Sequence, residues 1–216
     1  MNKFKFLDRY IGKHQPPCSS GDKWVKELRA QILSRCSVVE KAIFVSLIPA
    51  ENMRESATVS VSLAESFAKS GKSVLLLDFD LNVPKVSSLI KNNSPKEFIC
   101  NSTYSLHSSN FFTHEKYPNF YYFSSDSSVR NYQDLLASDA FGRFMGECVK
   151  SFEIVISLTT PADICSSYML ASKNADIAIL LAKQDSTKVN PLYKVISNLK
   201  LIDINNPFWL FINGDF

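Results

Sequence analysis

Short, continuously apolar runs alternate along this chain with segments that carry apolar residues at every third or fourth position. The clearest runs are 42–48 and 74–80, and between them Val61, Ala64 and Ala68 follow a helical spacing. Continuous apolar strands are typical of a parallel sheet covered on both faces, since neither face of such a strand meets water. The alternation therefore predicts an α/β fold, a doubly wound and mainly parallel sheet flanked by helices.

The same rhythm continues to the end of the chain, so a single domain is predicted over residues 21–216. Residues 1–20 end in a cluster of Pro and Ser and are predicted to be a flexible N-terminal arm. Residues 91–119 are polar and are predicted to be a long loop with room for a short helix. Further strands are predicted at 120–123, 154–156, 177–181 and 208–212, and helices at 132–152, 164–172, 191–201 and after Asp22.

Composition excludes several classes of function. A net charge of +3 on 216 residues is too small to indicate a nucleic-acid partner. No apolar run approaches the ~20 residues that span a bilayer, and the first ten residues lack a signal peptide's apolar stretch. The five cysteines are scattered, and with only three histidines they form no metal-binding pattern. These features predict a cytoplasmic protein with reduced thiols and no metal site.

The turn at residues 46–58 is where a doubly wound fold of this kind would bind an anion. A phosphate-binding loop needs glycines for its backbone geometry, and a Lys and a Ser or Thr for the phosphates and Mg²⁺. Here no glycine occurs between Gly21 and Gly71, while Glu51 and Glu55 add negative charge. At an effective dielectric constant near 20, a carboxylate about 4 Å from a phosphate costs on the order of 4 kcal/mol. Ordinary ATP-driven catalysis is therefore not expected.

Residues 68–84, A-K-S-G-K-S-V-L-L-L-D-F-D-L-N-V-P, resemble a pattern of the bacterial tyrosine kinases of exopolysaccharide and capsule synthesis. That family belongs to the MinD/ParA-like P-loop NTPases, and its pattern is A-x-x-G-K-x-V-L-L-I-D-A-D-L-R-x-P. Residues 131–136, 152–161 and 211–214 resemble further family motifs in the same order. The resemblance covers roughly residues 22–214, and it implies a P-loop NTPase-like fold.

The family's nucleotide-binding positions are changed in this chain. Aligned from the first strand, Met53 stands where the family has its phosphate-binding Lys. Aligned backwards from the end of the following helix, Ser56 stands there and Thr58 takes the final Ser/Thr position. Leu158 stands where the family has the aspartate of its second acidic motif, and Arg54 is a candidate replacement for the missing cation. The resemblance thus implies a vestigial nucleotide site with both Walker motifs degenerate.

Three other residues fall on family site positions. Asp78 and Asp80 match acidic residues that in the family approach Mg²⁺ and act in catalysis. The alternative, which we favour without the lysine, is that they hold the end of the strand by accepting backbone N–H groups. Asn213 matches the L-N-G motif near the family's adenine site, and a place in the final turn accounts for it equally well.

The first predicted helix carries basic residues where the family has an E-x-x-R-x-x-R motif used in ring formation. The corresponding residues are Lys23, Lys26 and Arg29, so the leading carboxylate is reversed in sign. Together with the basic N-terminal arm, this helix is our candidate partner interface.

Three functions follow from the resemblance. The first is a catalytically inactive, pseudokinase-like scaffold or regulator of exopolysaccharide or capsule synthesis and export, with no cofactor. Its expected partners are a membrane polysaccharide co-polymerase or an active tyrosine kinase subunit, with peripheral membrane association through the partner and a homo-oligomer left open. The alternatives are an atypical ATPase or tyrosine autokinase that uses ATP and Mg²⁺, and a MinD/ParA-like localisation or pilus-assembly accessory protein.

Overall fold

A computed structural model gives the structure of the chain, and two predictions lie outside the residues that it describes: the arm at residues 1–20, and Asn213. The described residues are 23–36, 42–80, 86–90, 94–95, 111–124, 132–183, 187, 189–204 and 207–212.

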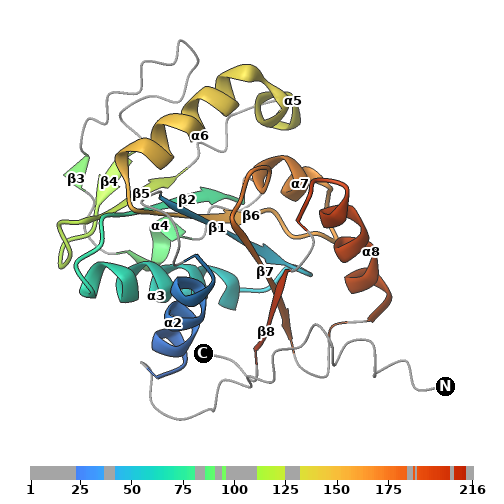
Figure 1. Cartoon of the computed structure of the whole chain (residues 1–216), viewed down its shortest axis with the longest axis horizontal. Helices are drawn as coiled ribbons and strands as arrows, with labels where there is room; N and C mark the ends of the chain where they lie inside the picture. Colours follow the sequence, from blue (N-terminus) through green and yellow to red (C-terminus); the bar gives the residue numbers. More distant parts are fainter. Residues whose placement is uncertain are drawn as a thin grey trace.

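An eight-stranded sheet forms the centre of the described structure, in the order β3-β4-β5-β2-β6-β1-β7-β8 (Figure 1). Six neighbouring strands, from β5 to β8, run parallel, and β3 and β4 extend the β5 edge in antiparallel pairing. The predicted fold class, a mainly parallel doubly wound sheet, is confirmed. The strands are β1 Ile43–Pro49, β2 Val74–Phe79, β3 Ser94–Pro95, β4 Phe111–Thr113, β5 Phe120–Ser124, β6 Ile154–Thr159, β7 Ile177–Lys183 and β8 Phe208–Ile212.

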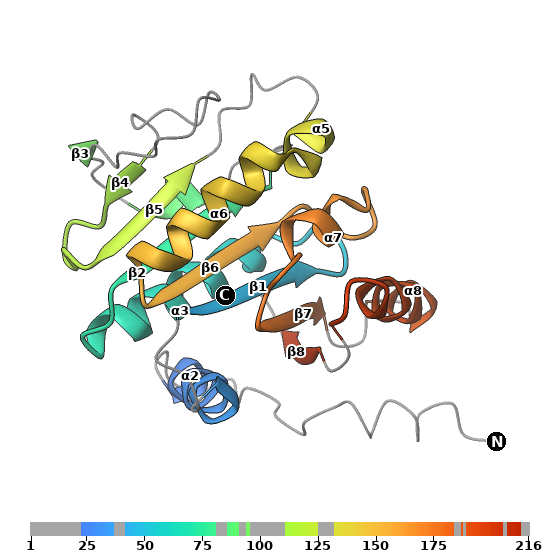
Figure 2. The ribbon, with the colours of Figure 1, turned by 45° about the horizontal axis from the view of Figure 1, so that its top comes forward.

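Helices cover both faces of the sheet (Figure 2). Along β1, Val45 and Leu47 pack in one apolar cluster with α2 and α3, while Phe44 and Ile48 pack in clusters on the opposite face with α6 and α8. Successive strand residues point to opposite faces, which explains why the strands are apolar at every position. The helices are α2 Lys23–Cys36, α3 Glu55–Lys69, α4 Val86–Leu89, α5 Tyr132–Ala137, α6 Asp139–Ser151, α7 Ser167–Ala171 and α8 Val189–Lys200.

The prediction of one helix over residues 132–152 is wrong, because the chain breaks at Ser138 into α5 and α6. Ser138 has an extended backbone, with φ −79° and ψ 153°, and its hydroxyl accepts the N–H of Phe141 at 3.3 Å. This is the geometry of an N-cap, in which a serine oxygen satisfies one of the first free N–H groups of a helix.

The structure corrects two other predicted segments. The predicted helix 164–172 begins only at Ser167, because Ile164 and Cys165 first close a turn onto the carbonyl of Pro161. Within the predicted loop 91–119, β4 forms a strand because Phe111 packs on Phe123 of β5, with ring centroids 5.0 Å apart.

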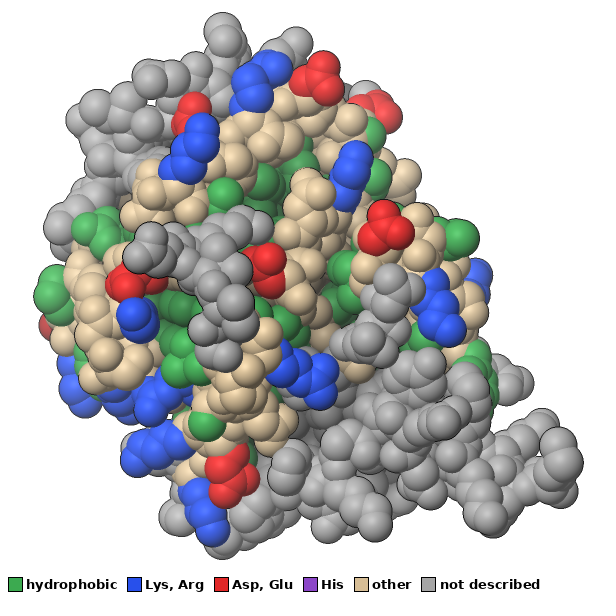
Figure 3. Space-filling model, viewed as in Figure 1, with side chains coloured by type: hydrophobic (Ala, Val, Ile, Leu, Met, Phe, Trp, Pro, Cys, Tyr) green, Lys and Arg blue, Asp and Glu red, His purple; other side chains and the backbone are tan. Residues whose placement is uncertain are grey.

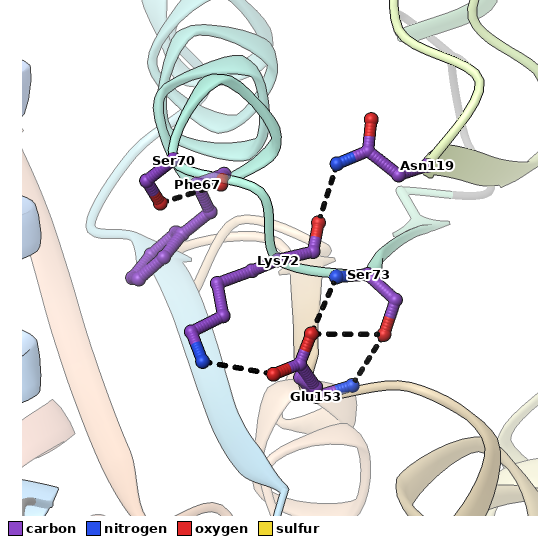
Figure 4. Close-up of polar contacts among 6 residues, drawn as sticks. All are labelled: Phe67, Ser70, Lys72, Ser73, Asn119 and Glu153. Carbon is purple, nitrogen blue, oxygen red and sulfur yellow. Dashed lines mark hydrogen bonds and ion pairs between the residues drawn. The ribbon is translucent and has the colours of Figure 1, made fainter.

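A group of polar contacts links the amino ends of β2 and β6, next to the carboxyl end of α3 (Figure 4). Glu153 accepts bonds from the ammonium of Lys72 at 2.8 Å and from the N–H of Ser73 at 2.9 Å, and these contacts hold the pKa of its carboxyl below the usual value. The Asn119 amide donates to the carbonyls of Ala68 and Lys72. Hydrogen bonds and an ion pair therefore hold the amino ends of these two strands together.

Over the part of the chain that the structure describes, no helix combines the length and apolar character needed to cross a membrane.

Candidate functional site

The loop between β1 and α3, residues 50–54, lies at the carboxyl edge of the sheet, where doubly wound folds bind their ligands. Neighbouring segments anchor the start of this loop on both sides. The N–H of Ala50 donates to the carbonyl of Leu181 at the end of β7, at 2.8 Å. The carbonyl of Pro49 accepts the N–H of Ala162, just after β6, at 2.9 Å. The loop is thus tied to the two strands that flank β1.

Met53 and Leu158, the residues expected at the family's lysine (in the alignment from the first strand) and second aspartate, belong to one apolar cluster. Met53 is 1% exposed and Leu158 is fully buried, and both pack in the cluster that α3 forms with the sheet. Leu158 faces this side because the preceding residue, Ser157, points to the other face, where its hydroxyl bonds that of Ser46 at 3.2 Å. Apolar side chains therefore fill both of these positions.

The other candidate residues of this segment, Arg54, Ser56 and Thr58, place no buried cation at the lysine position in either of the two alignments. Ser56 is buried and its hydroxyl donates to the carbonyl of Met53 at 2.8 Å, so this side chain is used to hold the first turn of α3. Arg54 precedes α3 with an exposed side chain, and Thr58 is half-buried on the helix. The structure places Arg54 on the surface of the loop.

Asp78 and Asp80 lie at the carboxyl end of β2, and both are buried. One carboxylate oxygen of Asp78 accepts the N–H of Asp80 at 3.0 Å, and the other accepts the N–H of Val86 at 3.1 Å. This matches the structural role that we favoured for Asp78, since its carboxylate joins the end of the strand to the start of α4. Among the described residues, no group of three His, Cys, Asp or Glu side chains is placed to hold a metal ion.

The sequence analysis did not identify a second cluster of polar contacts at the carboxyl edge of the sheet. The carboxylate of Glu55 pairs with the ammonium of Lys183 at 2.8 Å. Beside this pair, the hydroxyl of Thr187 donates to Glu51 at 2.7 Å and accepts the N–H of Lys183 at 2.9 Å. The one available signal was that Lys183 ends an apolar run, which places it at the carboxyl edge of a parallel sheet.

Comparison of this fold with known proteins identifies its relatives by structure. No protein-family model matches the chain, and no curated protein matches it in sequence. The VpsO kinase domain matches it with a TM-score of 0.71 at 18% identity, over 100% of both chains. The kinase domain of the Escherichia coli tyrosine kinase ETK matches with a TM-score of 0.74 at 14% identity, over 98% of this chain and 88% of that one. This chain has the bacterial tyrosine kinase fold.

The MinD cell division protein of Aquifex aeolicus also matches, with a TM-score of 0.56 at 13% identity. That match covers 81% of this chain and 70% of MinD. The structural likeness to tyrosine kinase domains and to MinD agrees with the resemblance seen in the sequence. At these identities it establishes the fold alone.

Within this tyrosine kinase fold, α2 packs on α3 through a buried side that includes Leu28 and Ile32. Arg29 is half-buried, and its guanidinium donates to the carbonyl of Ser66 on α3. Lys23 and Lys26 are exposed, and Lys and Arg side chains gather over α2 and the neighbouring part of α3 (Figure 3). The predicted interface residues thus divide into two exposed lysines and an arginine that fastens the helix.

Proposed function

We propose that this protein is a catalytically inactive, pseudokinase-like scaffold or regulator in bacterial exopolysaccharide or capsule synthesis and export. The observation that carries the proposal is the burial of Met53 and Leu158 in one apolar cluster. By the resemblance, Leu158 stands at the family's aspartate. Met53 stands at its lysine when the chains are aligned from the first strand, and the other alignment places the buried Ser56 there. Because phosphoryl transfer depends almost wholly on positioning and on charge, an apolar cluster there supplies neither of the required poles.

Two carboxylates strengthen the argument against nucleotide binding. Glu51 lies in the turn after β1, and Glu55 is the first residue of α3. The phosphates of a nucleotide would lie at this turn. The negative charge of the two carboxylates repels a triphosphate, and each is already engaged, with Thr187 and Lys183 respectively. A nucleotide would have to displace these contacts, because its phosphates would compete with the carboxylate of Glu55 for Lys183.

A protein of this kind would act through its surface. The exposed residues Lys23 and Lys26 belong to α2, the helix over which Lys and Arg side chains gather (Figure 3). We propose that this basic surface binds the cytoplasmic end of a membrane polysaccharide co-polymerase or an active tyrosine kinase subunit. The protein would then reach the membrane through that partner.

The absence of nucleotide binding is tested by thermal unfolding with Mg²⁺ and ATP. Millimolar Mg-ATP should leave the melting temperature unchanged, whereas a ligand at 100 times its Kd adds about 2.7 kcal/mol of stability. For a domain of this size, that would raise the melting temperature by roughly 5–10 °C. An active tyrosine kinase domain of the same fold serves as the positive control. A shift that Arg54→Ala removes would instead support the atypical enzyme.

The partner surface is tested by charge reversal. The double variant Lys23→Glu/Lys26→Glu should weaken co-purification with the co-polymerase or the kinase subunit about tenfold, a loss of about 1.4 kcal/mol. The matched control is Lys194→Glu/Lys200→Glu, which reverses two exposed lysines on α8. Equal weakening by both pairs would show a general effect of charge and would contradict a surface on α2.

A further inference from the structure

We infer that the first turn of α3 and Lys183 form an anion-binding position that the protein fills with its own carboxylate, that of Glu55. The inference rests on the proposed function, because a site open to nucleotide could not hold an internal anion in the same place. It also identifies Lys183, the last residue of β7, as the cation of this position.

The contacts of Glu55 identify it as the occupant. Glu55 is the first residue of α3, where the aligned peptide dipoles favour a negative charge. Its side chain is only 6% exposed, and its carboxylate lies 2.8 Å from the ammonium of Lys183. Ligand anions at helix N-termini are stabilised by the same dipole. Here the anion is covalently part of the helix.

The burial of this pair separates it from an ordinary surface ion pair. The Lys183 side chain is 33% exposed, and Glu55 is among the most buried charged residues of the described structure. Exposed pairs contribute little, since water and salt screen them. A buried carboxylate must instead be compensated where it lies, and Lys183 supplies the compensating charge.

A second contact holds the β7–α8 connection against the same loop. The single hydroxyl of Thr187 serves two partners, because it donates to Glu51 and accepts the N–H of Lys183. Thr187 ties the connection after β7 to Glu51 of the β1–α3 loop, and Lys183 ties the end of β7 to Glu55 at the start of α3. The protein's own side chains thus join the β1–α3 segment to the end of β7 and the residues that follow it.

Chemical rescue with formate tests this inference. Glu55→Ala removes the carboxylate and vacates the volume that it fills, so a small carboxylate can bind beside Lys183. Sodium formate should raise the melting temperature of this variant in a saturable way, by about 3–6 °C at roughly ten times its Kd. Sodium chloride at equal ionic strength is the salt control. The wild-type protein and Glu55→Ala/Lys183→Met should respond to the two salts alike.

Each outcome decides between the inference and its alternative. A folded Glu55→Ala variant that responds to formate no more than to chloride contradicts the inference. If Glu55→Ala fails to fold, folding of Glu55→Ala/Lys183→Met supports it, because the double variant removes the cation as well. If neither folds, packing and not charge is decisive, and the inference is wrong. Binding of Mg-ATP by the wild-type protein would contradict the proposed function, whereas a failed rescue contradicts only the internal anion.

Discussion

Replacing Leu158 with aspartate should unfold the protein and should not restore a magnesium site. Leu158 is fully buried in the apolar cluster shared with Met53. Loss of a buried leucine costs about 2–5 kcal/mol, and burial of an uncompensated charge adds to this cost. The sum is about 5 kcal/mol or more, which is a large part of the 5–15 kcal/mol that stabilises a typical domain. Chemical denaturation measures the loss.

Leu158→Asn is the matched control, because it removes the same volume without adding a charge. Burial raises the pKa of an introduced aspartate above its unfolded value, so the charged form destabilises the folded state as the pH rises. The stability difference between the aspartate and asparagine variants should therefore be largest at neutral pH and shrink towards pH 4. A Leu158→Asp variant with wild-type stability at pH 7 would show that this position is polar.

Replacing Asp78 with alanine should destabilise the protein by about 3–5 kcal/mol, equally with and without Mg²⁺. The fully buried carboxylate accepts two backbone N–H groups, from Asp80 and Val86, and the variant leaves both donors without it. Hydrogen bonds to charged groups contribute about 1.5–3 kcal/mol each. The melting temperature should fall by roughly 10 °C for a domain of this size.

Two controls separate this role from metal binding. Asp78→Asn keeps one oxygen acceptor, so its loss of stability should be intermediate. Asp176→Ala removes an exposed carboxylate that accepts one strand N–H, from Phe44 at 2.8 Å, and should cost much less. A wild-type melting temperature for Asp78→Ala, or a loss that occurs only in the presence of Mg²⁺, would contradict the structural role.

The order of strands and helices could be predicted because the patterns that specify it are local. The runs that become β1, β2, β6 and β7 are apolar at successive positions, and this pattern does not depend on the rest of the chain. The break at Ser138 also has a local sequence signal, a serine before an acidic residue. Strand β4 has no such local signal, since its place depends on the packing of Phe111 against β5 and α6.

The candidate site divides in the same way. The sequence alone determined that the turn after β1 lacks glycine and lysine, because this is a statement about residue types, and the resemblance implies that Leu158 stands where the family has an acidic residue. Only the tertiary structure decided that Met53 and Leu158 belong to one apolar cluster and that Glu55 pairs with Lys183. The pairing joins residues from distant parts of the chain. It exists because parallel strands bring their carboxyl ends to one edge, and no local pattern records which side chains meet there.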